Sequence, residues 1–172
     1  MQLLETDRLL LRPFTLDDAE GLYAYASHPE VGPPAGWRPH RSVEESRQVI
    51  ENIFVPSDAL AVLRKSDGRL IGSAGFVDRH RTELGTPSEE IGYSLARDCW
   101  GQGYATEAAR AMLAFAGETL GARAFVAEHA VDNPASGRVM AKCVLVFDHF
   151  GEYSKLDGSE TFKAKSWRLE LE

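Results

Sequence analysis

The chain has 172 residues, 44% of them hydrophobic, which suits a single folded domain, 1–172, with a complete core. Its 26 acidic and 19 basic residues give a net charge of −7, which argues against nucleic acid as a direct partner and is compatible with a cationic substrate. No apolar run approaches the roughly 20 residues that span a bilayer, and Met1 leads into charged residues rather than a signal peptide. We therefore expect a cytoplasmic protein with no membrane partner.

The chain has two cysteines, Cys99 and Cys143. They lie far apart and lack the C-x-x-C spacing, so neither a disulfide framework nor a zinc site is indicated. No histidine stands at a spacing that suggests a nucleophilic pair with either thiol. We expect both side chains to pack in the apolar core, and we expect no metal.

The first part of the chain predicts a strand, a helix, a loop and a second helix. Residues 9–12 read as a strand, and Thr15 begins a helix with one apolar face. Residues 27–41 are rich in proline and glycine, and their Trp37 either lines a pocket or pins the loop to the core. Residues 42–45 (SVEE) have capping-box spacing and begin the second helix.

Two strand-like runs, 60–64 and 70–76, flank Asp67-Gly68, a strong hairpin signal that predicts an antiparallel pair. The polar segment 78–88 then leads to a third strand at 90–95.

The last part of the chain predicts a mixed sheet. Residues 124–129 form a strand that the preceding helix, ending at Gly121, allows to lie parallel to strand 90–95. Asn133 caps a further helix that begins with Pro134. Residues 146–153 and 167–171 read as closing strands around the polar turn 156–160.

The stretch 90–121 predicts a strand, a glycine loop and a helix. Residues 90–95 alternate as in a strand, Gly101 and Gly103 follow, and apolar residues then recur at helical spacing. Glycine lets the backbone turn tightly and approach a ligand, and the first N–H groups of a helix have no internal partner. The order therefore predicts an anion site, and a phosphate-bearing ligand is the leading interpretation.

Four stretches together resemble a known family: residues 6–13 (TDRLLLRP), residues 90–93 (EIGY), residues 100–108 (WGQGYATEA), and residues 133–136 (NPAS) with Lys142. Their order and spacing resemble the GNAT acyltransferase superfamily, and within it the branch of ribosomal-protein N-terminal acetyltransferases of the RimJ/RimL type. The resemblance implies an α+β fold, the GNAT acyl-CoA N-acyltransferase fold. Its mixed, mostly antiparallel central sheet is flanked by about four helices.

The resemblance also implies acetyl-CoA as the cosubstrate. Backbone N–H groups of residues 101–106 would hold its pyrophosphate, Leu95 would offer backbone groups to the pantetheine arm, and a nearby N–H would stabilise the oxyanion. Trp100 stands where the family usually has Gln or Arg, and it would cover the cofactor. The expected cofactor-binding residues are Leu95, Trp100, Gly101, Gln102, Gly103, Tyr104, Ala105, Thr106 and Asn133.

Four residues are candidates for catalysis of direct acetyl transfer to an amine. Glu90 is the first candidate for the base and Glu89 the second, while a solvated strand-end carboxylate is the alternative for Glu90. The tyrosine that protonates the thiolate in many family members would stand at Met140, so Ser136 is the candidate acid. His129 is a further candidate base or a satisfied histidine at a strand end. The side chain of Tyr104 either stacks near the cofactor or faces solvent.

The family usually has a glycine where this chain has Val144, at the end of the late helix. A glycine there commonly has positive φ, which is unfavourable for a β-branched residue. The sequence therefore predicts either a remodelled turn or a strained valine.

Three functions remain open. The first is an acetyl-CoA-dependent N-acetyltransferase acting on a protein N-terminus or a small amine, and its alternative is a non-catalytic acyl-CoA-binding module on the same fold. A nucleotide-dependent oxidoreductase is disfavoured because Thr106 stands where a Rossmann fingerprint needs its third glycine. The acceptor amine stays open, as does the choice between a monomer and a homodimer.

Overall fold

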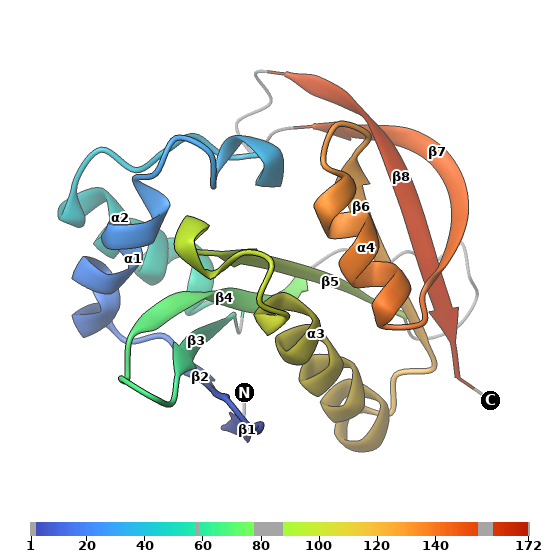
Figure 1. The fold of residues 1–172 in the computed structure, drawn as a ribbon, viewed down its shortest axis with the longest axis horizontal. Coiled ribbons are helices and arrows are strands. Elements are labelled where there is room, and N and C mark those ends of the chain that lie inside the picture. The colour runs from blue at the N-terminus through green and yellow to red at the C-terminus, as the bar shows by residue number, and fades with distance from the viewer. Residues whose placement is uncertain (1–2, 58, 78–87, 155–159, 172) are drawn as a thin grey trace.

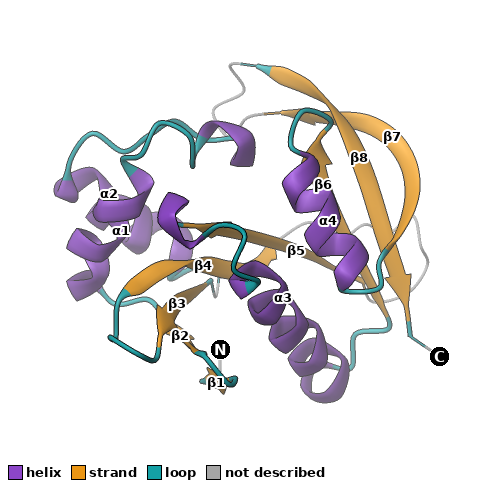
Figure 2. Ribbon diagram, viewed as in Figure 1, coloured by secondary structure: helices purple, strands orange, loops and turns teal. Residues whose placement is uncertain are grey.

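The computed structural model describes residues 3–57, 59–77, 88–154 and 160–171 (Figure 1; Figure 2). The strands are β1 (Leu4–Glu5), β2 (Leu9–Pro13), β3 (Leu60–Arg64), β4 (Leu70–Val77), β5 (Ser88–Leu95), β6 (Ala124–Ala130), β7 (Val146–Ser154) and β8 (Thr161–Glu170). The α-helices are α1 (Ala19–Ala26), α2 (Val43–Val49), α3 (Tyr104–Phe115) and α4 (Pro134–Lys142). Short 3-10 turns cover Leu16–Asp18, Pro33–Ala35 and Arg97–Cys99, and wider π turns follow α2 (Ile50–Phe54) and α3 (Ala116–Leu120).

The strands form one eight-stranded sheet in the order β1-β2-β3-β4-β5-β6-β8-β7. Neighbouring strands are antiparallel except β5 and β6, which are parallel. The predicted hairpin is confirmed as β3 and β4, with Gly68 at φ +70° in its turn. The predicted mixed, mostly antiparallel sheet with four helices is likewise confirmed.

Alternation along β5 places helices on both faces of the sheet. The Tyr25 hydroxyl of α1 lies 3.5 Å from Ser94 Oγ, whereas the Tyr93 hydroxyl donates to the Ser136 carbonyl of α4 at 3.0 Å. Adjacent residues of a strand point to opposite faces, so α1 and α4 lie on opposite faces of the sheet. Helix α2 packs beside α1 and α3 beside α4, which gives a sheet with a helical layer on each side.

Apolar side chains fill the space between the sheet and each helical layer. Met112 and Phe125 are fully buried on the α3 side, and Leu22 and Ile50 on the α1 and α2 side. Each such side chain contributes roughly 1.5–3 kcal/mol by leaving water. The sheet therefore has two cores, and the middle strand β5 contributes to both.

Local signals predicted several elements well. The Ser42 hydroxyl accepts the Glu45 N–H at 3.1 Å at the start of α2, as the capping-box spacing predicts. The Glu45 carboxylate does not return to Ser42, however, but accepts the Arg41 N–H at 2.6 Å. Trp37 is partly buried and packs against the core, so it pins its loop. Cys99 and Cys143 are buried free thiols, as predicted.

The starts of two strands were predicted wrongly, and one strand was missed. The strand predicted at 167–171 is β8, which begins at Thr161, because its polar first half pairs with β7. The two-residue strand β1 was missed, since it depends on pairing with Leu10 and Leu11. Strand β5 begins at Ser88 rather than at residue 90. Residues 78–87 of the predicted polar segment, and 156–159 of the predicted turn, lie outside the described residues.

The turn after α4 is not remodelled, and Val144 is strained. Its φ is +60°, the one positive value for a non-glycine residue in the described part of the chain. The Leu145 N–H donates to the Met140 carbonyl and the Val144 N–H to the Ala141 carbonyl, both at 3.1 Å. These are the two bonds of a Schellman motif, whose left-handed position is usually glycine. The backbone geometry of the family is thus retained with an unfavourable residue.

Candidate functional site

The loop between β5 and α3 turns on two left-handed glycines. Gly101 has φ +75° and Gly103 has φ +85°, a region that side chains with a Cβ rarely adopt. Gly103 directly precedes the first residue of α3, so the chain enters the helix through this position. The two glycines were predicted from their spacing, and the positive φ values explain why glycine occupies both positions.

This loop presents unused hydrogen-bond donors. Within the described residues, no backbone N–H from Gly101 to Thr106 donates a hydrogen bond. The N-cap residue of α3 is Gly103, which has no side chain that could accept one of them. The first N–H groups of a helix have no internal acceptor, and they coincide with the positive end of the helix dipole. Successive free N–H groups around a left-handed residue form a concave anion site. The loop is therefore shaped to hold an anion such as a phosphate.

Side chains from the start of the protein brace this loop. The Glu107 carboxylate accepts hydrogen bonds from Thr6 Oγ1 at 2.6 Å, from the Arg8 N–H at 2.9 Å and from Arg8 Nε at 2.7 Å. Arg8 also donates to the Gln102 carbonyl at 3.0 Å and lies over the Tyr104 ring, 4.4 Å from its centroid. We call this set Thr6, Arg8 and Glu107 the N-terminal brace. It fixes the loop to the segment before β2.

The strands beside this loop separate. The parallel register of β5 and β6 is limited to Ser88 with Ala124, Glu89 with Phe125 and Glu90 with Val126. Beyond Glu90 the two strands continue without pairing, so a wedge opens between them toward the glycine loop (Figure 1). A wedge between parallel strands exposes backbone groups that would otherwise bond across the sheet.

The exposed backbone groups of β5 can be assigned from its pairing with β4. The Ala96 N–H donates to the Ile71 carbonyl at 2.7 Å. Hydrogen-bonded and non-hydrogen-bonded positions alternate in an antiparallel pair, so Leu95 opposite Gly72 and Tyr93 opposite Ala74 do not bond to β4. Their N–H groups therefore point toward the wedge. The Leu95 carbonyl points the same way, and it accepts the Trp100 indole N–H at 2.8 Å.

The start of α4 brings further polar groups to the other side of the wedge. Asn133 Oδ1 accepts the Ser136 N–H at 3.4 Å, while Asn133 Nδ2 donates to Ser136 Oγ at 3.0 Å and to the Pro34 carbonyl at 3.3 Å. The Tyr93 hydroxyl reaches the Ser136 carbonyl from β5. Burial raises the pKa of Tyr93, so its phenol keeps its proton. Tyr93 was not among the predicted site residues, and only its position within the EIGY stretch could have drawn attention to it.

Glu90 lies where the two strands begin to separate. Its side chain is 5% exposed, which excludes the alternative of a solvated strand-end carboxylate. By alternation it shares a face of β5 with Ser94, on the α1 side of the sheet, while the half-buried Glu89 lies on the α3 and α4 side. The two candidate bases therefore point to different faces.

The sequence matches the model of the acetyltransferase (GNAT) domain over residues 8–145. The chain belongs to the GNAT acetyltransferase family. It is 30% identical over 148 residues to the uncharacterized N-acetyltransferase YoaA of Bacillus subtilis, a match covering 81% of this chain and 80% of that protein. It is 33% identical over 120 residues to the uncharacterized N-acetyltransferase p20 of Bacillus licheniformis, covering 66% of this chain and 65% of that protein. The chain is accordingly an N-acetyltransferase.

Solved structures share the fold at low sequence identity. A putative ribosomal-protein-serine acetyltransferase from Vibrio cholerae superposes with a TM-score of 0.83 at 20% identity, covering 98% of this chain and 97% of that one. Microcin C7 self immunity acetyltransferase MccE, in complex with acetyl-CoA and AMP, superposes with a TM-score of 0.77 at 18% identity, covering 96% and 94%. These likenesses establish the GNAT fold, and they leave the RimJ/RimL branch a prediction.

Two aromatic residues of the loop differ from each other in this GNAT protein. Tyr104 is 8% exposed, so its side chain does not face solvent, and that sequence alternative was wrong. Trp100 is 40% exposed, with the Arg97 guanidinium 4.7 Å from its ring centroid. The Tyr104 side chain is thus largely enclosed by the protein, whereas that of Trp100 is accessible.

One further polar residue, His129, lies beneath α4. His129 is 5% exposed, and its Nδ1 lies 2.7 Å from the Ala130 carbonyl, but its Nε2 has no hydrogen-bond partner among the described residues. The histidine is thus only half satisfied. Burial lowers the pKa of His129, which favours the neutral ring. The position of the family tyrosine, Met140, is 3% exposed.

Burial raises the pKa of both Cys99 and Cys143, which disfavours their thiolates. In the described segments no group of three His, Cys, Asp or Glu side chains could hold a metal ion. No helix described here is both long and apolar enough to cross a bilayer.

Proposed function

We propose that this GNAT protein transfers the acetyl group of acetyl-CoA directly to a primary amine in a ternary complex. The observation that carries the proposal is the row of unused N–H groups from Gly101 to Thr106 at the mouth of the wedge. A diphosphate suits this row because it supplies several acceptor oxygens and the negative charge that a helix N-terminus favours. Trp100 would lie over the bound cofactor, and Asn133 would contact its arm.

The wedge residues supply the remaining groups. Acetyl-CoA provides an activated thioester whose carbonyl oxygen gains negative charge as the amine attacks. The N–H groups of Tyr93 and Leu95 point into the wedge, where they can donate to that oxygen, and preorganised donors of this kind contribute about 3–4 kcal/mol each. The proposed oxyanion donors are thus two N–H groups, two residues apart in β5, instead of the single N–H expected near Leu95.

Proton transfer is assigned to residues on the two sides of β5. An α-amine with a pKa near ~8 needs only modest help to become neutral, and Glu90 on the α1 side would take its proton. Ser136 accepts from Asn133 at 3.0 Å, so its own O–H is available to protonate the departing thiolate. Tyr93, whose phenol donates to the Ser136 carbonyl, holds this residue in place.

The acceptor is a protein N-terminal amine or a small cationic amine. The net charge of −7 favours a cation in either case. The RimJ/RimL branch that the sequence resembles favours a protein N-terminus, as in ribosomal-protein acetyltransferases. We propose that the enzyme acts in the cytoplasm and without a metal.

Two measurements test the proposal. Calorimetric titration should give saturable binding of coenzyme A and none of NAD. Release of free thiol from acetyl-CoA should then depend on an added amine, when peptides of varied N-terminal residue and small amines are screened separately. No heat with coenzyme A overturns the site. Binding without thiol release for any amine supports the non-catalytic module instead.

A further inference from the structure

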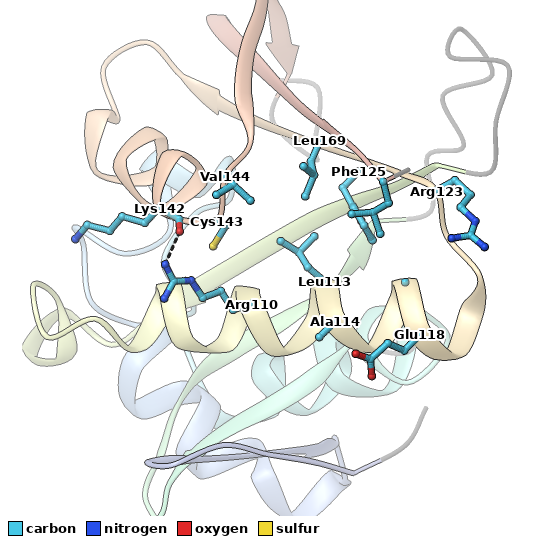
Figure 3. A pocket seen from close by; sticks show the side chains of 12 residues that line it. Arg110, Leu113, Ala114, Glu118, Arg123, Phe125, Lys142, Cys143, Val144 and Leu169 are labelled. Atoms are coloured by element: carbon cyan, nitrogen blue, oxygen red, sulfur yellow. Dashed lines mark hydrogen bonds between the residues drawn. The ribbon is translucent and has the colours of Figure 1, made fainter.

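A cavity lies away from the proposed acetyl-CoA site. It is a groove of about 560 Å³ between the C-terminal half of α3, the end of α4 and strands β6 and β8 (Figure 3). None of its lining residues belongs to the wedge or the glycine loop. Leu113 and Gly117 follow Gly103 by enough residues to lie roughly 15–20 Å further along the helix. We call this cavity the α3–α4 groove.

The groove combines an apolar floor with a charged rim. Val144, Leu169 and Leu171 supply accessible apolar surface, and the buried Leu113, Phe125 and Cys143 lie beneath it. Arg110 and Lys142 lie at one end, whereas Arg123 and Glu118 lie at the other (Figure 3). The first end therefore carries two positive charges, and the charges at the second end balance. An elongated apolar body with one anionic head matches this distribution.

The cations of the groove differ from most others in the protein. Arg8, Arg12, Arg38, Arg64, Arg69 and Arg97 each form an ion pair with a carboxylate. Arg110, Arg123 and Lys142 form none with the residues that the structure describes. Arg110 instead donates to the Lys142 carbonyl at 2.6 Å, which covers the carbonyl that would otherwise repel an anion at the end of α4. Unpaired cations in a chain of net charge −7 favour an anionic ligand.

Val144 is an independent observation at the same place. It holds a left-handed conformation, it is 68% exposed, and its side chain lines the groove (Figure 3). A glycine would relieve the backbone strain, and a polar residue would suit the exposure. Backbone strain persists mainly where a side chain serves a ligand or a switch. An apolar ligand in the groove would cover the isopropyl group.

We propose that the α3–α4 groove binds a small amphipathic carboxylate, with its head at Arg110 and Lys142 and its medium-length apolar body along Leu169 and Leu171. Val144 closes over the body of the ligand. The site is separate from the acetyl-CoA site, so its occupancy does not depend on catalysis.

Decanoate is the probe that tests the proposal, by calorimetry and thermal shift at pH 7.5 below its micellar concentration. It should bind saturably and raise Tm. Butyrate, which has the same head and little tail, and decyltrimethylammonium, which has the same tail and the opposite head, should do neither. Decanoate should also bind when coenzyme A is present at saturation. Equal binding of decyltrimethylammonium overturns the proposal, and so does displacement of decanoate by coenzyme A.

Matched variants locate the site. Lys142→Gln should weaken decanoate binding about tenfold because a charged partner of the head is lost, whereas Glu118→Gln in the same groove should leave it unchanged. Val144→Gly should raise the Tm of the free protein and weaken decanoate binding. Unchanged binding by both Lys142→Gln and Val144→Gly overturns the proposal. A dimer in sedimentation velocity that Val144→Glu dissociates also overturns it, since a second copy of the chain would then be the occupant.

Discussion

The loop that begins α3 and the turn that ends α4 both require a left-handed residue, and they meet the requirement differently. Gly103 adopts φ +85° without a side chain, whereas Val144 adopts φ +60° with a β-branched one. Under the proposed function the backbone at the start of α3 must also stay open to a diphosphate, so a Cβ there would hinder binding as well as strain the chain. At the end of α4 the strain lowers the stability of the free protein, and the side chain that causes it lines the α3–α4 groove. The fold fixes the backbone conformation in both places, but only the first place fixes the residue.

The largest effect should come from replacing Gly103, at the start of α3, with a valine like that at the end of α4. Gly103→Val places a β-branched residue at φ +85° and moves the N–H groups that follow, so the Kd for coenzyme A should rise about 100-fold, or ~2.7 kcal/mol. Calorimetric titration measures this. Gly68→Val is the matched control, since Gly68 has φ +70° with open space around it in the β3–β4 turn. Both variants should lose stability. Equal coenzyme A affinity in the two variants would refute the role of the loop.

The next largest effect is expected on kcat from a change at the start of α4, and not from a change at its end. Tyr93→Phe removes the hydrogen bond to the Ser136 carbonyl, so Ser136 should be less well placed as an acid, and kcat should fall about tenfold, or ~1.4 kcal/mol. The KM for acetyl-CoA should stay within about twofold, because the phenol does not reach the glycine loop. Steady-state kinetics with a reactive amine measure both constants.

The control for Tyr93→Phe is Val144→Gly, which alters the far end of the helix and should leave kcat unchanged. Unaltered turnover in Tyr93→Phe would show that the contact between β5 and α4 has no part in the reaction. A second discriminating test uses an acetyl thioester whose thiol is a better leaving group. If Ser136 acts as the acid, this donor should restore most of the turnover of Tyr93→Phe, because the thiolate then needs no proton.

A smaller effect of opposite sign is expected at the second turn. Val144→Gly removes strain of roughly 1–2 kcal/mol. Glycine also makes the unfolded chain more flexible, which offsets roughly 0.5–1 kcal/mol of that gain. The free energy of unfolding should therefore rise by about 1 kcal/mol. For a domain of this size that raises Tm by about 2–4 °C, measurable by calorimetry. Val146→Gly is the control, because Val146 is similarly exposed but lies in β7, where glycine should destabilise. A fall in Tm for Val144→Gly would contradict the strain.

The smallest effect concerns the residues on which α4 rests. A Cβ at Gly137 would come within 2.7 Å of His129 Nε2, so the neutral ring lies directly beneath the helix. The pKa of His129 is lowered by burial, so the unfolded chain takes up the proton first and stability falls as pH decreases below about 6.5. Urea unfolding at pH 7.5 and pH 5 should show a steeper loss for the wild type than for His129→Gln. The control is His149→Gln, which changes an exposed histidine and should lose as much stability as the wild type. An equal loss in the wild type and in His129→Gln would show that His129 does not cause the pH dependence.

Local chemistry made much of the fold predictable. The Asp67-Gly68 hairpin, the Ser42 cap and the Asn133-Pro134 helix start each depend on a few adjacent residues, and all three formed as expected. The glycine loop was predictable for the same reason. Its side-chain environment was not, since Arg8 covers the Tyr104 ring from almost 100 residues away in sequence.

The wedge lies beyond sequence reasoning because it depends on where pairing stops. Alternation predicted strands β5 and β6, yet nothing in either strand indicates that their parallel register ends at Glu90 and Val126. The burial of Glu90 and the reach of Tyr93 to Ser136 follow from that divergence. Val144 shows the converse case. Its departure from the family pattern predicted either a remodelled turn or a strained valine, and the structure retains the family backbone with the valine strained.

The N-terminal brace has a thermodynamic consequence. Because three donors from Thr6 and Arg8 converge on one carboxylate beside the loop, any anion that orders the loop also holds the first strands in place, and the coupling is reciprocal. Fraying of the amino terminus and occupancy of the loop are then opposing equilibria. Amide hydrogen exchange in β1 and β2 should therefore slow when the loop is filled, so that the beginning of the polypeptide reports on a site formed a hundred residues later.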